Sequence, residues 1–236
     1  MREPLVLLPG FMCDARVFGP QVAALSRDTP VMVAPVTEGD RIEEIASSIL
    51  TAAPAKFGVA GMGFGGAVAM ELVRRAPERV TRIALIDASP LAETPQDASA
   101  REARIIRART GRLREVLEED IVTAGLAVSP YRGDVLALAL DMGLHLGADV
   151  YTRQSRTLMR RKDQQAVMRK CKAPALVVCG AENAVLPVKR HDFLATLIPN
   201  ARLEVIAGAG HLAALEQPEA VINVLRAWQR QPQTVS

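Results

Sequence analysis

The sequence predicts an α/β fold, with a doubly wound, mostly parallel sheet and one helical insertion. Three observations lead to it. Short apolar runs of strand length recur along the chain, helix-length segments separate most of them, and one long stretch breaks the alternation. Continuous apolar runs are typical of strands buried on both faces, as in a parallel sheet. Alternating strands and helices favour the doubly wound arrangement.

The expected elements follow from these runs and from the Gly, Pro, Asn and Asp residues that bound them. Strands are expected at residues 5–8, 31–34, 57–60, 83–86, 175–179 and 203–206. Helices are expected at about 16–26, 41–53, 65–76, 188–198 and 218–230. Pro218 at the start of the last helix and Glu219 in its first turn are typical of a helix N-terminus.

The stretch from 95 to 172 has no strand-like run and many arginines at helical spacing. Leu113, Val116, Leu117 and Ile121 form an apolar stripe that predicts a helix with one buried face. The predicted organisation is therefore a core at 1–94 and 173–236, with a helical lid at 95–172.

Composition excludes several classes of protein. The chain has 236 residues, of which 49% are hydrophobic and 23% charged, so it can bury a core and is not disordered. Few aromatics (3%) and a net charge of +3 argue against a single-stranded nucleic-acid binder. Three irregularly spaced cysteines predict no disulfide framework and no metal cluster. Without a signal-peptide core or a membrane-length apolar run, we expect a soluble, cytoplasmic protein with no cofactor, no nucleic-acid partner and no membrane contact.

Charge is unevenly distributed. Residues 101–172 hold 15 basic and 9 acidic residues, whereas the rest of the chain holds 14 basic and 17 acidic residues. A basic lid over a slightly acidic core favours a small anionic substrate. The arginines near the start of the lid either form a solvated helical face, or one or two of their guanidinium groups bind a substrate carboxylate or phosphate. They are Arg101, Arg104, Arg107, Arg109, Arg112 and Arg114.

The most informative motif is Gly61-Met62-Gly63-Phe64-Gly65, between an expected strand and an expected helix. A G-x-S-x-G sequence in that setting is the nucleophile elbow of α/β-hydrolases. The chain resembles the small bacterial, lid-bearing members of that superfamily, but glycine occupies the serine position.

Three further segments support the resemblance. Leu8-Pro9-Gly10-Phe11-Met12 resembles the oxyanion loop, which implies that the N–H of Phe11 or Met12 and that of Phe64 would hold an oxyanion. Gly208-Ala209-Gly210-His211 resembles the loop that carries the catalytic histidine. Residues 180–187 resemble the loop that carries the acid, whose position falls on Asn183.

The resemblance implies hydrolysis of a small ester, thioester, lactone or related carbonyl compound by serine-type acyl transfer. Glycine cannot attack a carbonyl, and asparagine can favour the wrong tautomer of the histidine. We therefore expect a very poor serine hydrolase. Three explanations remain open: an enzyme altered to trap a ligand, a member that only binds, or a lyase or oxygenase that uses His211 as base.

Other residues are weaker candidates. Asp87, at the end of an expected strand, and Glu182 are alternative acids. Met12 and Met62 are expected to line the substrate pocket with Phe11 and Phe64. His145 either contacts substrate or packs within the lid, and His191, beside Lys189 and Arg190, is expected at the surface.

Overall fold

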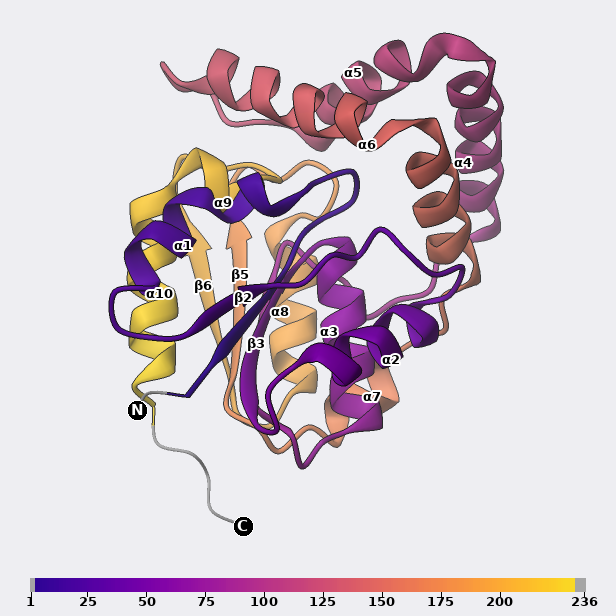
Figure 1. Ribbon diagram of the computed structural model, residues 1–236. Coiled ribbons are helices and arrows are strands. Elements are labelled where there is room, and N and C mark those ends of the chain that lie inside the picture. Colours follow the sequence, from indigo (N-terminus) through magenta and orange to yellow (C-terminus); the bar gives the residue numbers. More distant parts are fainter. Residues whose placement is uncertain (1–2, 232–236) are drawn as a thin grey trace.

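The computed structural model describes residues 3–231 and shows one six-stranded sheet (Figure 1). The strands are β1 (Leu5–Leu8), β2 (Val31–Val33), β3 (Phe57–Met62), β4 (Val80–Ile86), β5 (Ala175–Gly180) and β6 (Ala201–Ile206). They lie in the order β2-β1-β3-β4-β5-β6, and every pairing is parallel. The predicted fold class is confirmed, and each expected strand lies within three residues of an observed one.

Helices cover both faces of the sheet. One face packs against α1 (Gly19–Leu25) and α10 (Pro218–Gln229), and the other against α2 (Ile42–Ala52), α3 (Phe64–Arg75) and α8 (Val188–Leu197). Alternate residues of a strand serve the two layers, because successive side chains point to opposite faces. Thus Leu5 and Leu7 lie in one apolar cluster, and Val6 and Leu8 in the other.

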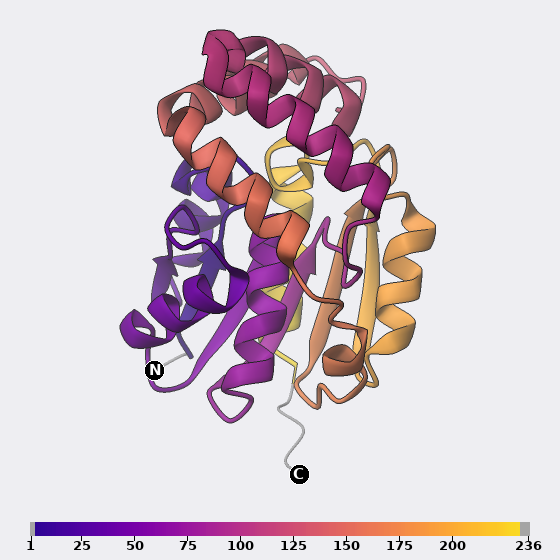
Figure 2. The same ribbon diagram turned by 90° about the vertical axis from the view of Figure 1, so that its right-hand side faces the viewer.

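The insertion is helical and stands over the carboxyl ends of the strands (Figure 2). It contains α4 (Pro95–Arg107), the short π-helical segment η2 (Ala108–Arg112), α5 (Leu113–Ala124) and α6 (Arg132–Arg160). Val116 and Leu117 of the predicted stripe are buried against Ile105 and Tyr151. These contacts give the lid an apolar cluster of its own.

Helix α6 joins the lid to the core. Gly147, with φ +82°, breaks the helix, and the second half descends along the core (Figure 1). There Gln154 and Arg153 donate hydrogen bonds to the carbonyl oxygens of Val36 and Thr37. By length and composition alone, α6 is long and apolar enough to span a membrane, whereas the sequence-based expectation was that no apolar run reaches that length.

The last part of the predicted lid packs on the core. Helix α7 (Gln165–Arg169) follows α6, and its Met168 is fully buried in the cluster beneath α3. Gln164 donates from its side chain to the carbonyl of Ala67 in α3, 3.2 Å away. The segment around 164–172 is thus a connection along the core surface that leads into β5.

Candidate active site

A cavity of about 630 Å³ lies between the lid and the carboxyl ends of the strands. Gly63, Asp87 and His211, which come from three separate loops, all line it. A second hollow of about 860 Å³ opens at the opposite end of the strands, at their amino ends, between α3, α7 and the start of β4. None of the predicted site residues lines that hollow, so the cavity beneath the lid is the candidate site.

The glycines of the elbow allow very close packing. A Cβ added to Gly61 would lie 2.3 Å from the carbonyl oxygen of Gly65, and one added to Gly65 would lie 2.2 Å from that of Leu8. Gly63 has φ +50° and ψ −108°, a conformation that costs energy for any other residue. A Cβ there would have only the Asp87 carbonyl oxygen nearby, at 3.8 Å. A serine would therefore fit the space at position 63, although its backbone would be strained.

Two backbone N–H groups are available beside Gly63. Phe64 begins α3, where the first N–H groups of a helix have no partner within the helix. Among the described residues, the Phe11 N–H has no hydrogen-bond acceptor, whereas the N–H of Met12 donates to Oε1 of Gln154 at 2.8 Å. The structure thus favours Phe11 over Met12 as the second donor of an oxyanion hole.

Three side chains form a hydrogen-bonded chain behind the cavity. The amide nitrogen of Asn183 is 2.9 Å from Oδ1 of Asp87 and 3.1 Å from Nδ1 of His211. The amide oxygen of Asn183 accepts from the N–H of Leu186 at 2.9 Å, which fixes the orientation of the amide. Asp87 therefore contacts His211 only through Asn183.

This chain determines the tautomer of His211. An amide NH₂ can only donate, so Nδ1 of His211 must accept and the ring proton lies on Nε2. Burial lowers the pKa of His211 to about 4, with a smaller contribution from His191, so the ring is neutral near pH 7. Neutral His211 thus has Nε2–H as a donor and cannot act there as the base of a serine hydrolase.

Asp87 is a buried carboxyl with three N–H donors. Besides Asn183, the backbone N–H groups of Gly180 and Ala213 lie 3.2 and 3.4 Å from its oxygens. Burial raises its pKa to about 7 despite these donors. At neutral pH it is therefore divided between its charged and neutral forms.

Sequence reasoning missed Glu216, which holds the histidine loop. Its buried carboxylate accepts from the N–H groups of Gly210 and Leu212, at 3.0 and 2.9 Å, and from that of Ala127 at the base of the lid, at 2.6 Å. His211 N–H also donates to the carbonyl of Gly125, 3.3 Å away. The loop that positions His211 is thus fixed to the segment that joins α5 to α6.

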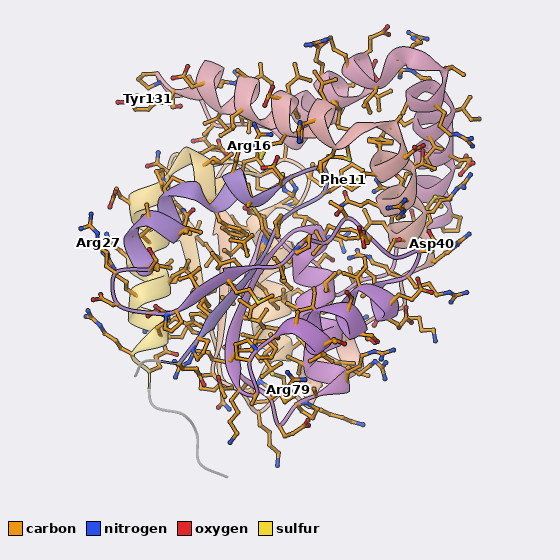
Figure 3. All side chains as sticks on the ribbon, in the orientation of Figure 1. Phe11, Arg16, Arg27, Asp40, Arg79 and Tyr131 are labelled. Carbon is orange, nitrogen blue, oxygen red and sulfur yellow. The ribbon has the colours of Figure 1, made fainter. Side chains whose placement is uncertain are left out.

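The apolar candidates line the cavity. Phe11, Met12, Met62 and Phe64 all do so. Phe11 lies where the core meets the lid (Figure 3), with its ring 5.3 Å from that of Tyr151 and the guanidinium of Arg101 over its face at 5.4 Å.

The three remaining candidates lie elsewhere. His145 must be removed from the predicted site, because its side chain is exposed on α6 and does not line the cavity. The prediction that His191 lies at the surface is wrong, because it is fully buried on the inner face of α8. Glu182 is exposed and also lies outside the cavity lining.

Most of the lid arginines are paired with carboxylates of the same region. Arg107, Arg112 and Arg114 pair with Glu119, Glu115 and Glu118. Arg101 and Arg104 do reach the cavity, but they pair with Glu93 at 2.6 Å and Asp120 at 3.3 Å. Five of the six arginines near the start of the lid are therefore paired, although residues 101–172 as a whole keep an excess of basic over acidic residues.

The cavity has no nucleophile at position 63. Phe11, Phe64 and His211, which line it with Gly63, are its candidate hydrogen-bond donors. Cys13 lines the cavity, but burial raises the pKa of its thiol to about 12, so it is not a thiolate nucleophile near pH 7. Within residues 3–231, no cluster of three or more His, Cys, Asp or Glu side chains is placed to hold a metal ion.

Comparison with known proteins identifies the relatives of this chain. A model of the alpha/beta hydrolase family matches residues 5–224. The pimeloyl-[acyl-carrier protein] methyl ester esterase of Aromatoleum aromaticum is 29% identical, over 92% of this chain and 94% of the relative. The enzyme of that name from Nitrosomonas europaea is 25% identical, over 78% of this chain and 75% of its own length.

Solved structures share the fold. A thermophilic esterase from Thermogutta terrifontis, solved with malate bound, superposes with a TM-score of 0.88 at 24% identity, covering 98% of this chain and 91% of the other. The enol-lactonase from Burkholderia xenovorans gives 0.86 at 22% identity, covering 98% and 92%.

Proposed function

Because this chain belongs to the alpha/beta hydrolase family, we propose that it binds a small ester or related carbonyl compound above Gly63, and that its serine-type hydrolysis is absent or very weak. The names of its relatives support the ester class, since several are methyl ester esterases. We further propose that it acts on small molecules in the cytoplasm.

One observation carries the proposal: residues with N–H donors line the cavity together with position 63, which has no nucleophile. Phe11, Phe64 and His211 line it with Gly63, and the Asn183 hydrogen bond leaves His211 with a proton on Nε2. Donors of this kind stabilise a carbonyl oxygen or an oxyanion. They cannot form the acyl-enzyme that serine-type hydrolysis requires.

A competent version of this site needs two changes. A serine at position 63 would attack the carbonyl, and an aspartate at position 183 would accept a hydrogen bond from Nδ1–H of His211. The base at Nε2 would then be free to take the serine proton. The space around Gly63 fits a serine, and an aspartate at position 183 would keep the contact with His211. Its oxygen would lie about where the amide nitrogen now donates to Asp87 at 2.9 Å, so Asp87 would have to be protonated and donate to it, which its pKa of about 7 allows.

The test is an ester panel run on four proteins: the chain as it stands, Gly63→Ser, Asn183→Asp and the double variant. We expect rapid hydrolysis only in the double variant. Gly63→Ser alone should be slower by about 10⁴, the effect of the equivalent Asp-to-Asn loss in a serine protease. If the unchanged chain hydrolyses esters as fast as the double variant, the proposal is wrong.

A second candidate, lyase or oxygenase chemistry with His211 as base, needs an unprotonated Nε2. The hydrogen bond from Asn183 favours the opposite tautomer. This candidate predicts turnover by the unchanged chain that His211→Ala abolishes, so the same panel, extended to elimination and oxygenation assays, tests it.

A further inference from the structure

The lining of the cavity includes an arginine, Arg161, that has no role in the proposed binding of a carbonyl group above Gly63. Arg161 follows α6 and lines the same cavity as Gly63 and His211. Among the residues that the structure describes, its guanidinium has one acceptor: Nη1 donates to the carbonyl oxygen of Ser89 at 3.2 Å. Its Nε is shielded from solvent and has no acceptor within residues 3–231. A guanidinium carries five N–H donors, so most of its hydrogen-bonding capacity remains unused.

The neighbouring charges leave one positive charge in excess. The carboxylate that attracts Arg161 most strongly, that of Glu93, is buried and already bound by Arg101, through contacts of 2.6 to 3.1 Å. No carboxylate within the described part of the chain lies within 4 Å of Arg161. Asp163 is close enough to attract it but is exposed and accepts hydrogen bonds from Gln165. Two guanidinium groups therefore share one carboxylate in this part of the wall.

Of the other charged groups that line the cavity, Arg190 is exposed to solvent, and the remaining ones are already engaged. Arg104 pairs with Asp120, which also accepts from the hydroxyl of Tyr151 at 2.9 Å. Asp97 accepts from Thr94 in the cap of α4. Burying an unpaired charge is costly, and burial indeed lowers the pKa of Arg161. A ligand that brings a negative charge would offset that cost.

We propose that Arg161 binds an anionic oxygen-acid group, a carboxylate or a phosphate, on the ligand whose carbonyl lies above Gly63. This inference rests on the proposed function and specifies its ligand: an ester that carries a second, negatively charged group. The Ser89 carbonyl that holds Arg161 is two residues from Asp87, whose carbonyl oxygen lies 3.8 Å from a Cβ added at Gly63. Arg161 and Gly63 also line one cavity, so a single ligand with two polar groups is expected to reach both.

The test compares two ligands of the same length, the monomethyl and dimethyl esters of glutaric acid, by calorimetric titration of the unchanged chain. We expect the monoester to bind about 10- to 100-fold more tightly, as for a hydrogen-bonded contact with a charged group. Arg161→Gln should remove this preference and leave diester affinity within about twofold. Arg161→Lys should keep part of it. The matched control is Arg160→Gln, which removes an exposed arginine from the preceding position and should change neither affinity.

Thermal melting separates ligand binding from a structural role. If Arg161 only fastens α6 to Ser89, Arg161→Gln lowers the Tm and weakens both esters equally, and the inference is overturned. Competition by inorganic phosphate identifies the anion: displacement of the monoester assigns a site open to phosphate, and no displacement assigns a carboxylate site. Equal binding of the two esters overturns the inference but leaves the proposed function standing. Failure of both esters to bind contradicts the proposed function itself.

Discussion

Replacing Gly63 with serine separates the strain of the elbow from its chemistry. Gly63 has φ +50° and ψ −108°, and an added Cβ would meet nothing closer than 3.8 Å. The cost is therefore backbone strain without a steric clash, about 1–3 kcal/mol for a non-glycine residue. For a chain of this size about 1 kcal/mol shifts the Tm by roughly 2–4 °C, so Gly63→Ser should melt roughly 2–12 °C lower.

The assay is thermal unfolding of Gly63→Ser and Gly63→Ala beside the unchanged chain. Both variants should melt lower by similar amounts, because strain depends on Cβ and not on the hydroxyl. Gly133→Ser is the matched control: Gly133 lies in the first turn of α6, has no positive φ, and has nothing within 4 Å of an added Cβ. It should melt at or above the parent temperature. If Gly63→Ser melts higher than the parent, the strain argument fails.

Three further substitutions test the environment of the site. Asn183→Asp should raise the pKa of His211 from about 4 toward or above its ordinary value, because a carboxylate favours the imidazolium; an unchanged NMR titration would contradict the hydrogen-bonded chain. His191→Leu should leave stability at pH 8 intact, since neither ring nitrogen of His191 has a hydrogen-bond partner within the described residues. It should remove a loss of roughly 3 kcal/mol as the pH falls from 6.5 toward 4. Stability falls with pH because the pKa of His191 is lowered in the folded chain, so the unfolded chain takes up the proton first. An equal loss of stability in His191→Leu and in the parent would refute this prediction. The control is His145→Leu, at an exposed histidine. Glu216→Gln should lower the free energy of unfolding by about 1–3 kcal/mol, because the amide NH₂ would face a backbone N–H. The exposed control Glu219→Gln should lower it by less than about 1 kcal/mol. Equal melting temperatures of the two variants would show that Glu216 does not fix the histidine loop.

The sheet and lid could be predicted because their signals are local. Uninterrupted runs such as Leu5–Leu8 and Ala175–Gly180 are fully buried strands, as parallel sheets require. Likewise, the elbow motif needs glycine where α3 meets β3 and β1, and the added-Cβ contacts of Gly61 and Gly65 show the physical reason. Such features depend on a few adjacent residues.

The features that the sequence did not predict depend on contacts between segments that are distant along the chain. His191 was expected at the surface because of its charged neighbours, although Leu194, one turn later, shares its buried face. Arg161 had no local signal, since its place in the cavity follows from the break at Gly147 and the return of α6 to the core. A count of charges also cannot show which guanidinium groups are free, and the structure shows that Arg107, Arg112 and Arg114 are paired with glutamates.

The most direct test follows the fate of a bound ester. The unchanged chain is incubated with monomethyl glutarate, and mass spectrometry then measures the ester, the free acid and any covalent acyl-protein. We predict a noncovalent complex from which the intact ester is recovered, with no acyl-protein and no free acid above the buffer control. Free acid produced at the rate of the Gly63→Ser, Asn183→Asp double variant, and lost in His211→Ala, would contradict the claim that this site holds a carbonyl compound without serine-type hydrolysis.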